Sequence, residues 1–233
     1  MKLSIVVPAY NEERLLGGTL DSIQRAVEIL SCPYEIIVCD NNSTDRTGEI
    51  ARAHGAKVVF EPVNQIARAR NAGAAAASGD WLVFIDADSS PSKELLAEMR
   101  KAMDSNGIVG GGATVDLNNS RPDIKAWVGL WNAMSRTLSW AAGSFIFCRA
   151  DAFRRIGGFS TEFYAGEEID LSRRMKKLGR FVILHRHPLR TSDRKAHLYR
   201  PREHFMFFLR FVLSGGRALR RREDTYLWYD GRR

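Results

Sequence analysis

Short apolar segments alternate with segments of helical pattern through the first half of the chain, and this alternation limits the folds open to it. The apolar segments, expected to be strands, are residues 3–7, 35–39, 57–60 and 81–85. The helices expected between and after them are residues 13–30, 45–54, 65–77 and 92–103. Strands and helices in this order build a mostly parallel sheet with helices on both faces. The sequence therefore predicts an α/β, Rossmann-like fold.

Polar residues gather directly after three of the predicted strands. Tyr10, Asn11 and Glu12 follow the first strand, Asp40 follows the second, and Asp86 begins the cluster after the fourth. Ligands in open α/β sheets bind at the carboxyl ends of the strands, near a switch in strand order. A ligand site is therefore expected at this edge.

Asp86 and Asp88 stand one residue apart at the end of the apolar segment 81–85. Mg²⁺ and Mn²⁺ prefer oxygen ligands and typically use one or two carboxylates, with substrate phosphates completing the coordination shell. This pattern indicates a divalent metal site. The alternative is structural, because Asp, Ser and Pro also suit the start of the helix 92–103.

Asp40 has two interpretations as well. A carboxylate at the tip of the second strand can accept hydrogen bonds from a base N–H or a ribose hydroxyl. It could instead cap the helix that begins near Ser43 or Thr44. Since Asp45 or Ser43 could serve as that cap, the ligand interpretation is favoured.

Common phosphate-binding motifs are absent from the sequence. No Gly-x-Gly-x-x-Gly follows the first strand, and no Gly-Lys-Ser or Gly-Lys-Thr ends a glycine-rich loop. The triple glycine at 110–112 follows a different segment, and we interpret it as flexible or closely packed chain rather than a phosphate cradle. A dinucleotide-binding domain and a P-loop enzyme are thereby excluded.

Composition limits the remaining classes. The chain has 233 residues, of which 45% are hydrophobic, enough for one large domain or a compact domain with an extension. Cys32, Cys39 and Cys148 are widely spaced among apolar residues and suggest neither disulfides nor zinc, so a reducing compartment is expected. No apolar run is long enough for a signal peptide or a membrane span. These features predict a cytoplasmic protein.

The net charge of +8 favours an anionic partner. Arginine is concentrated after residue 180, including Arg220, Arg221 and Arg222. The sequence has no zinc-finger spacing, aromatic RNA-binding signature or helix-turn-helix pattern. Nucleic acid is therefore not expected as the partner.

Four segments together resemble the family 2 glycosyltransferases, which have the GT-A fold. They are residues 6–12 (VVPAYNE), 38–45 (VCDNNSTD), 69–73 (ARNAG) and 84–88 (FIDAD), in the family's order. The resemblance is dense over residues 3–90, returns around 143–174, and is weak over 110–140 and beyond 201. It implies transfer of a sugar from a nucleoside diphosphate donor to an acceptor.

The resemblance also implies roles for individual residues. Pro8, Ala9, Tyr10 and Glu12 would line the nucleotide pocket, Asp40 would contact the base, Arg70 would lie near the donor, Asp86 would face the ribose and donor sugar, and Asp88 would ligate Mn²⁺ or Mg²⁺. A cation bridging both phosphates neutralises the charge that develops on the leaving group, which agrees with these roles.

A second acidic cluster, Glu167-Glu168-Ile169-Asp170, could supply the general base, because an attacking hydroxyl must lose its proton. The family has Asp where this chain has Glu168, so Glu168 aligns with the family's base. Glu167 and Asp170 remain alternatives. In a purely structural interpretation, the three carboxylates oppose the helix dipole beside Arg173 and Arg174.

The segment between the acidic clusters matches the acceptor side of the family. Residues 142–150 and the Gly157-Gly158-Phe159 turn resemble family segments that shape the acceptor site. Trp127, Trp131 and Trp140 precede them. Tryptophans can stack on sugars, but these are interpreted mainly as core residues of a helix.

Basic residues near position 190 have two interpretations. Arg194 and Lys195 match a family sequence whose basic residues approach the diphosphate, with solvated surface charge as the alternative. His185 or His187 could complete a metal shell, although their spacing does not define a metal site.

The last segment combines apolar and basic residues. Residues 204–213 are apolar apart from their first position and one arginine, and residues 217–222 are strongly basic. We expect either peripheral contact through 204–222 with the inner face of a membrane, or a terminal helix packed on the core or a second subunit. A lipid-linked or glycan acceptor and a homo-oligomer are both compatible with this pattern.

The sequence thus predicts a GT-A domain at 1–200, with a nucleotide-sugar half at 1–104 and an acceptor half at 105–200, followed by a basic extension at 201–233. The predicted function is metal-dependent, inverting glycosyl transfer, as in cell-envelope or polysaccharide biosynthesis. The alternatives are a sugar-nucleotide nucleotidylyltransferase and a non-catalytic nucleotide-sugar-binding protein.

Overall fold

A computed structural model of the chain describes residues 1–117, 121–192 and 217–225. Its strands are β1 (Leu3–Ala9), β2 (Tyr34–Asp40), β3 (Lys57–Phe60), β4 (Trp81–Ile85), β5 (Ser89–Ser90), β6 (Ile108–Leu117), β7 (Phe145–Arg149) and β8 (Arg180–Thr191). Its α-helices are α1 (Leu16–Val27), α2 (Thr47–Ala53), α3 (Ile66–Ala75), α4 (Lys93–Met103), α5 (Pro122–Leu138), α6 (Ala150–Arg155) and α7 (Glu167–Met175). Short 3₁₀ helices are η1 (Glu28–Leu30), η2 (Arg217–Arg220) and η3 (Glu223–Thr225).

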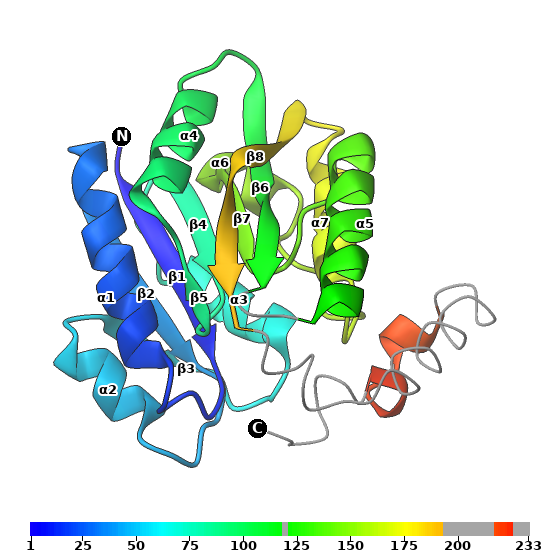
Figure 1. The fold of residues 1–233 in the computed structure, drawn as a ribbon. Coiled ribbons are helices and arrows are strands. Elements are labelled where there is room, and N and C mark those ends of the chain that lie inside the picture. The colour runs from blue at the N-terminus through cyan, green and yellow to red at the C-terminus, as the bar shows by residue number, and fades with distance from the viewer. Residues whose placement is uncertain (118–120, 193–216, 226–233) are drawn as a thin grey trace.

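The strands form one sheet in the order β3-β2-β1-β4-β7-β6-β8-β5 (Figure 1). Strands β1 to β4 pair in parallel with one another, whereas β7 runs antiparallel to both β4 and β6. The chain builds outward from β1 to β3 and then returns to place β4 on the other side of β1. The predicted α/β fold is confirmed, and the switch in strand order lies between β1 and β4.

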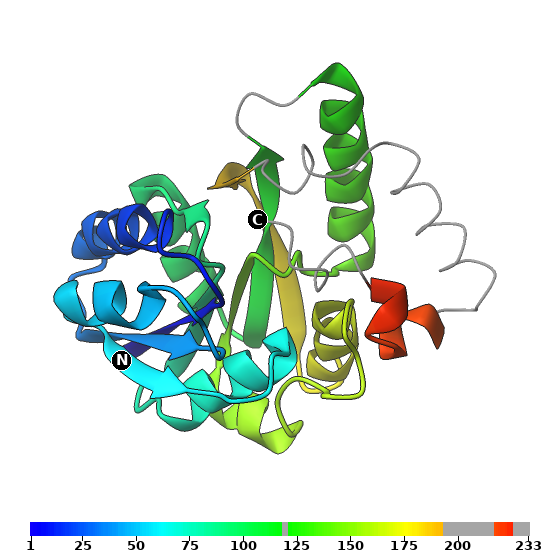
Figure 2. The same ribbon diagram turned by 90° about the horizontal axis from the view of Figure 1, so that it is seen from below.

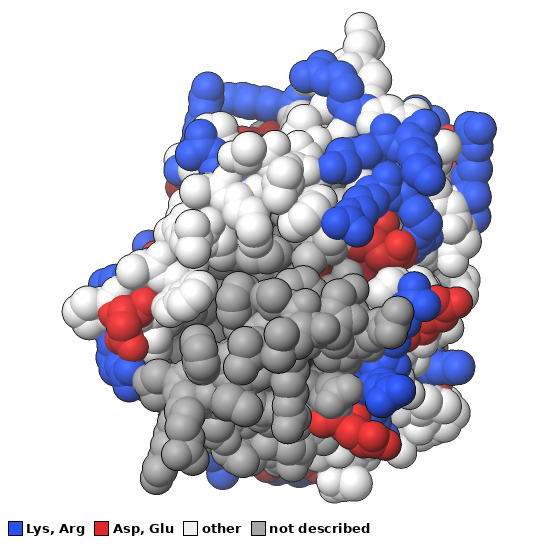
Figure 3. Space-filling model, turned by 90° about the vertical axis from the view of Figure 1, so that its right-hand side faces the viewer, with Lys and Arg blue, Asp and Glu red and all other residues white. Residues whose placement is uncertain are grey.

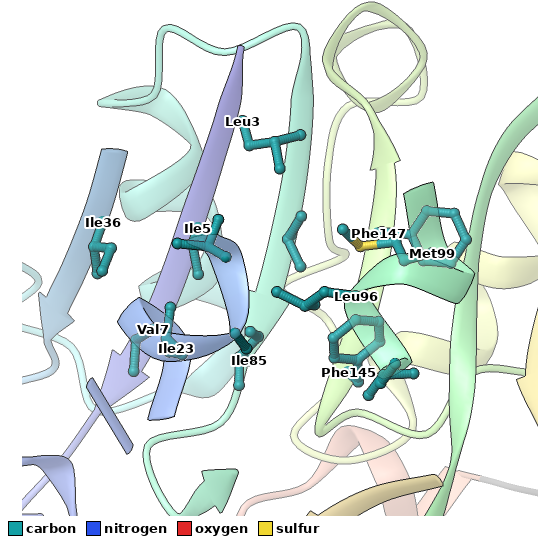
Figure 4. Packing of buried hydrophobic residues seen from close by; sticks show 14 of the residues in the cluster. Leu3, Ile5, Val7, Ile23, Ile36, Ile85, Leu96, Met99, Phe145 and Phe147 are labelled. Atoms are coloured by element: carbon teal, nitrogen blue, oxygen red, sulfur yellow. The ribbon is translucent and has the colours of Figure 1, made fainter. Parts of the chain in front are cut away.

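Helices cover both faces of the sheet, so neighbouring residues of a central strand enter different cores. Ile5 and Val7 of β1 pack with α1 and α4, whereas Val6 between them packs with α3, α6 and α7. Figure 4 shows the first core, where Ile23 of α1 and Leu96 of α4 meet the strands. Continuous apolar strands are expected when both faces are buried.

The triple glycine lies inside β6, beside β7 and β8. A side chain at Gly111 would place its Cβ 2.3 Å from the Val182 carbonyl oxygen and 2.6 Å from the Phe147 ring. The segment is therefore closely packed strand. Glycine is required because the neighbouring backbone and ring occupy the space of a side chain.

None of the helices in the described ranges is long and apolar enough to cross a membrane. Cys32, Cys39 and Cys148 are free thiols.

Candidate active site

The carboxyl ends of β1, β2 and β4 bring the first predicted site residues to one edge of the sheet, which Figure 2 views from below. Ala9 of β1 is paired in register with Asp40 of β2, so the two strands end level with one another. Proline has no backbone N–H and therefore cannot donate to a neighbouring strand. Pro8 is accommodated because β1 pairs with β4 only as far as Val6, so no hydrogen bond to β4 is lost at position 8.

The loops that follow β1 and β2 are bound to each other. Asn11 has a φ of 52°, and its backbone N–H donates to Ser43 Oγ (3.0 Å) while its Oδ1 accepts from Thr44 N (2.8 Å). Glu12 N donates to Thr47 Oγ1 at 2.8 Å. These cross-links fix one wall of the site before any ligand arrives.

Asp40 and Asp45 divide the local backbone donors between them. Asp45 Oδ1 accepts from Thr47 N (2.9 Å) at the start of α2, as a capping carboxylate would. Asp40 Oδ1 accepts from Ser43 N (2.9 Å), and its side chain is partly exposed. The structure therefore has Asp45 at the helix start and Asp40 at the open strand end.

Arg70, on α3, lies at the centre of the site and is only 1% exposed. Its Nη1 donates to Glu167 Oε1 (2.7 Å), and its Nη2 donates to Asp86 Oδ1 (3.0 Å) and to the Gly143 carbonyl (2.7 Å). Its guanidinium also lies 5.2 Å from the centre of the Phe159 ring. One buried cation thus joins α3 and the end of β4 to Gly143, before β7, and to the start of α7.

Asp86 and Asp88 both offer carboxylate oxygens at the end of β4. Asp86 is partly exposed beside Arg70, and Asp88 Oδ1 lies 3.4 Å from the Thr191 hydroxyl. No group of three His, Cys, Asp or Glu side chains suited to a metal occurs among the described residues. This donor set fits a Mn²⁺ or Mg²⁺ ion that takes its remaining ligands from water and substrate phosphates.

The three carboxylates of the second acidic cluster have different surroundings. Glu167 is 3% exposed and paired with Arg70. Asp170 accepts from Arg174 Nε at 2.7 Å, one helical turn later. Glu168 is partly buried with its carboxyl group beside Gly143, where a side chain would place its Cβ 3.7 Å from the Glu168 carboxyl carbon and 3.1 Å from Arg70 Nη2.

Burial raises the pKa of Glu168 to about 8, and repulsion from the neighbouring Glu167 carboxylate adds to the increase. Burial also raises the pKa of Glu167, although Arg70 opposes that change. A carboxyl group whose pKa lies near the working pH is suited to accepting a proton.

Two polar side chains of the α3 region hold the loop between α6 and α7. Asn71 donates to the Phe159 carbonyl (2.8 Å) and accepts from Phe159 N (2.9 Å). Gln65 Nε2 donates to the carbonyls of Thr161 (2.8 Å) and Phe163 (3.0 Å). Sequence reasoning missed Gln65, because a single glutamine before a helix belongs to no recognisable motif.

The remaining predicted residues fall elsewhere. His185 and His187 are exposed on β8, where their backbone N–H groups donate to the Glu98 carboxylate. Arg194, Lys195 and residues 204–216 lie outside the described residues. Trp127 is 64% exposed on α5, so its interpretation as a core residue was wrong.

The fold and this site define an α/β domain with a carboxylate-rich site at the carboxyl ends of its strands, and comparison with known proteins identifies the family. The model of Glycosyl transferase family 2 matches residues 4–159. The chain belongs to this family, as its motifs predicted, and it carries a family 2 glycosyltransferase domain.

Two curated relatives show the extent of the similarity. An uncharacterized glycosyltransferase of Mycobacterium tuberculosis is 38% identical over 106 residues, which cover 44% of this chain and 45% of the relative. Validoxylamine A glucosyltransferase of Streptomyces hygroscopicus is 27% identical over 219 residues, covering 76% of this chain and 52% of the relative. The chain spans about half the length of these relatives.

Solved structures share the GT-A fold. The mannosyltransferase PcManGT of Pyrobaculum calidifontis, in complex with GDP-Man and Mn²⁺, has a TM-score of 0.68 at 21% identity, with 91% of this chain and 61% of that chain covered. Glucosyl-3-phosphoglycerate synthase of M. tuberculosis, in complex with Mn²⁺, UDP and glucosyl-3-phosphoglycerate, has a TM-score of 0.63 at 23% identity, with 91% and 77% covered. At these identities the similarity establishes the fold.

Proposed function

We propose that this chain transfers a sugar from a nucleoside diphosphate sugar to an acceptor hydroxyl, with Mn²⁺ or Mg²⁺ and with inversion at the anomeric carbon. One observation carries the proposal: Arg70 joins Asp86, at the donor edge of the sheet, to the acidic cluster that contains Glu168. Donor-binding and proton-accepting groups are thereby held on two sides of one buried cation.

In this proposal the donor edge binds the nucleotide. Asp40 accepts a hydrogen bond from the base, while Pro8, Ala9, Tyr10 and Glu12 line the pocket whose loops are already cross-linked. Asp86 faces the ribose and donor sugar. Arg70 lies near the donor in this proposal, and its contacts with Asp86 and Glu167 would position both carboxylates.

Asp88, with Asp86 beside it, would hold the divalent cation. When bound there, the ion supplies positive charge to the leaving diphosphate. The solved PcManGT complex contains GDP-Man with Mn²⁺, and the synthase complex contains UDP with Mn²⁺, which supports a divalent ion and a uridine or guanosine diphosphate donor. Arg194 and Lys195 would contact the diphosphate and add further positive charge beside it.

Glu168 acts as the base in this proposal. Its carboxylate takes the proton of the acceptor hydroxyl as the hydroxyl oxygen bonds to the anomeric carbon, and the nucleoside diphosphate leaves with the electron pair of the broken C–O bond. Glu167 and Asp170 are less suited to this role, since each forms an ion pair with an arginine. Attack opposite the leaving group inverts the anomeric carbon.

Donor binding is tested by thermal stabilisation with a panel of nucleoside diphosphates and nucleotide sugars, each with Mn²⁺, Mg²⁺ or EDTA. A ligand at a hundredfold its Kd adds about 2.7 kcal/mol to the free energy of unfolding. We expect one nucleotide to stabilise the wild type, and EDTA or Asp88→Ala to abolish the effect. Asp104→Ala, an exposed carboxylate on the far end of α4, is the matched control.

Transfer can be tested without knowing the acceptor, because water can take the place of the acceptor hydroxyl and hydrolyse the donor slowly. We expect metal-dependent release of nucleoside diphosphate from the stabilising sugar donor, with NMR showing an inverted anomeric configuration in the first sugar released. Glu168→Gln should retain donor stabilisation and lose release. Full turnover in Glu168→Gln, or a retained anomeric configuration in the released sugar, contradicts the proposed base. Donor stabilisation of the wild type without release of nucleoside diphosphate from any donor favours a non-catalytic binding protein.

A further inference from the structure

Helix α5 presents a row of large apolar side chains to solvent. Trp127 is 64% exposed, Leu130 61%, Met134 37% and Leu138 39%. Their spacings of three and four residues place them on one face of the helix. Ser135 is the residue of α5 that the structure buries, so this helix leaves its apolar face outside the core.

The inner face of α5 is held to the sheet by polar contacts. Asn132 accepts from Val115 N (3.0 Å) and donates to the Val115 carbonyl (2.9 Å), so it continues the hydrogen bonding of β6. A surface helix ordinarily turns its apolar stripe toward the core and its polar face toward water. Because α5 turns a further row of apolar side chains to solvent, besides the half-buried Ile124, Val128 and Trp131, this exposed face is suited to a partner.

Basic side chains border this apolar face on the α7 side. Lys176 Nζ donates to the Leu138 carbonyl at the end of α5, and the Arg173 guanidinium lies 4.9 Å from the centre of the Trp140 ring. Both basic residues are exposed. Figure 3 views this side and shows Lys and Arg side chains gathered beside a largely uncharged area. Asp123, the acidic residue of α5, is paired with Arg121.

We propose that the α5 face, defined by Trp127, Leu130, Met134 and Leu138, binds an anionic lipid surface. An apolar helix face with an exposed tryptophan can enter the headgroup region while neighbouring Lys and Arg contact lipid phosphates. This contact would hold the acceptor-side half, including α7 and Glu168, close to the bilayer. The inference does not depend on the proposed transfer reaction.

A second copy of the chain is the competing occupant, and the charges disfavour it. A two-fold dimer interface uses the same patch on both subunits. Pairing this face with itself, with the two α5 helices antiparallel, would bring the basic border containing Arg173 and Lys176 close to an identical basic border. Like-charge contacts of this kind oppose association, whereas lipid phosphates neutralise the same residues.

The test is flotation of the full chain with vesicles. One set contains phosphatidylglycerol and phosphatidylcholine in equal amounts, and the other contains phosphatidylcholine alone. We expect the wild type to float with the anionic set, and high salt to reduce the floated fraction. Trp127→Ser combined with Leu130→Ser should lower partitioning about tenfold or more, since each side chain contributes apolar area to the contact.

The matched control is Phe60→Ser combined with Val63→Ser. Those residues are 60% and 46% exposed near the end of β3, in the nucleotide half, so this pair removes similar exposed apolar groups from another surface. The control variant should float as the wild type does. Circular dichroism would verify that both variants remain folded.

Three outcomes would overturn the proposal. In the first, the wild type does not float with anionic vesicles. In the second, the Trp127/Leu130 variant floats as well as the wild type. In the third, the Phe60/Val63 control variant loses as much flotation as the Trp127/Leu130 variant. Sedimentation equilibrium without lipid adds a fourth: a wild-type dimer that Trp127→Ser and Leu130→Ser dissociate would assign the face to a second copy.

Discussion

Glu168 has the most distinctive protonation behaviour at the residue scale. Its pKa of about 8 compares with 4.5 for an ordinary glutamate, because the carboxyl group is largely removed from water and lies beside the Glu167 carboxylate. A base acts in its deprotonated form, so we expect release of nucleoside diphosphate to increase with pH up to about 8 and then to level off. The rate should be measured between pH 5.5 and 9.5 at saturating metal and donor. A pH-independent rate would contradict the assignment.

The same pKa has a consequence for stability. Between 4.5 and about 8 the folded protein keeps a proton on Glu168 that the unfolded chain releases. The free energy of unfolding contributed by this group therefore falls as pH increases through that range. Glu168→Gln should remove this decline, because glutamine does not titrate. The free energy of unfolding of the variant minus that of the wild type should therefore be larger at pH 8.5 than at pH 5. Urea denaturation at the two pH values measures the difference.

Arg70 gives a prediction about buried charge. Removing the guanidinium in Arg70→Met leaves Glu167 buried without its partner, and breaking a buried pair costs about 3–5 kcal/mol. Adding Glu167→Gln should recover part of that loss, because the uncompensated charge is then gone. Urea denaturation of both single variants and the double variant completes the cycle.

Arg68→Met is the control for Arg70→Met, since Arg68 is an exposed residue on the same helix. It should change the free energy of unfolding little. Equal losses in the two variants, or a double variant that shows only additive effects, would mean that the pair is not coupled as the structure indicates.

At the scale of elements, η2 packs on the loop that leads into α7. The Leu219 carbonyl accepts from Tyr164 N (2.7 Å) and Ala165 N (3.3 Å), and the Arg220 guanidinium lies 5.0 Å from the centre of the Phe163 ring. Arg220 also lies 3.5 Å from the Glu162 carboxylate. These contacts join the end of the described chain to the segment that positions Glu167 and Glu168.

Leu219→Ala combined with Arg220→Ala removes the Leu219 side chain, whose Cδ1 lies 3.1 Å from where a Cβ at Gly166 would be, and the Arg220 guanidinium. We therefore expect this variant to slow nucleoside diphosphate release while leaving donor stabilisation unchanged, because the donor edge lies on other elements. A decrease of about tenfold would correspond to 1.4 kcal/mol. Arg221→Ala is the control, as this exposed neighbour makes none of these side-chain contacts. Unchanged release in the Leu219/Arg220 variant would show that η2 does not position α7.

The elements were largely predictable from the sequence where local pattern decides them. The predicted strands 57–60 and 81–85 have the observed bounds, because a continuous apolar run ends abruptly in polar residues. Helix α1 begins at Leu16 rather than residue 13, since the N–H groups of Leu15 and Leu16 both donate to the Glu12 carbonyl in a preceding turn.

The features that the sequence did not predict are those that depend on tertiary packing. An arginine within the alanine-rich helix α3 gives no local sign of burial, and Arg70 becomes buried only where α3, β4 and α7 meet. Trp127 is likewise exposed because α5 contacts β6 through the side of the helix that carries Asn132, whereas Trp127 lies on another side. Local periodicity identifies an apolar face but not the surface that covers it.

For the whole molecule, one sheet connects the two predicted halves, residues 1–104 and the described residues from 105 onward. β4 pairs with β7, β7 pairs with β6, and both cores include residues from the two halves. The halves should therefore unfold together rather than as separate units, with circular dichroism and tryptophan fluorescence giving the same urea midpoint.

Gly111→Ala tests this coupling from the acceptor side. The added methyl would lie 2.3 Å from the Val182 carbonyl oxygen, so β6 must move away from β8. Overpacking of this kind costs about 1–3 kcal/mol. If the sheet is one cooperative unit, both probes should shift to the same lower midpoint. Gly129→Ala, at an open position on α5, is the control and should not lower stability. Separate midpoints for the two probes would mean that β6 and β8 unfold independently of the strands that carry the donor edge.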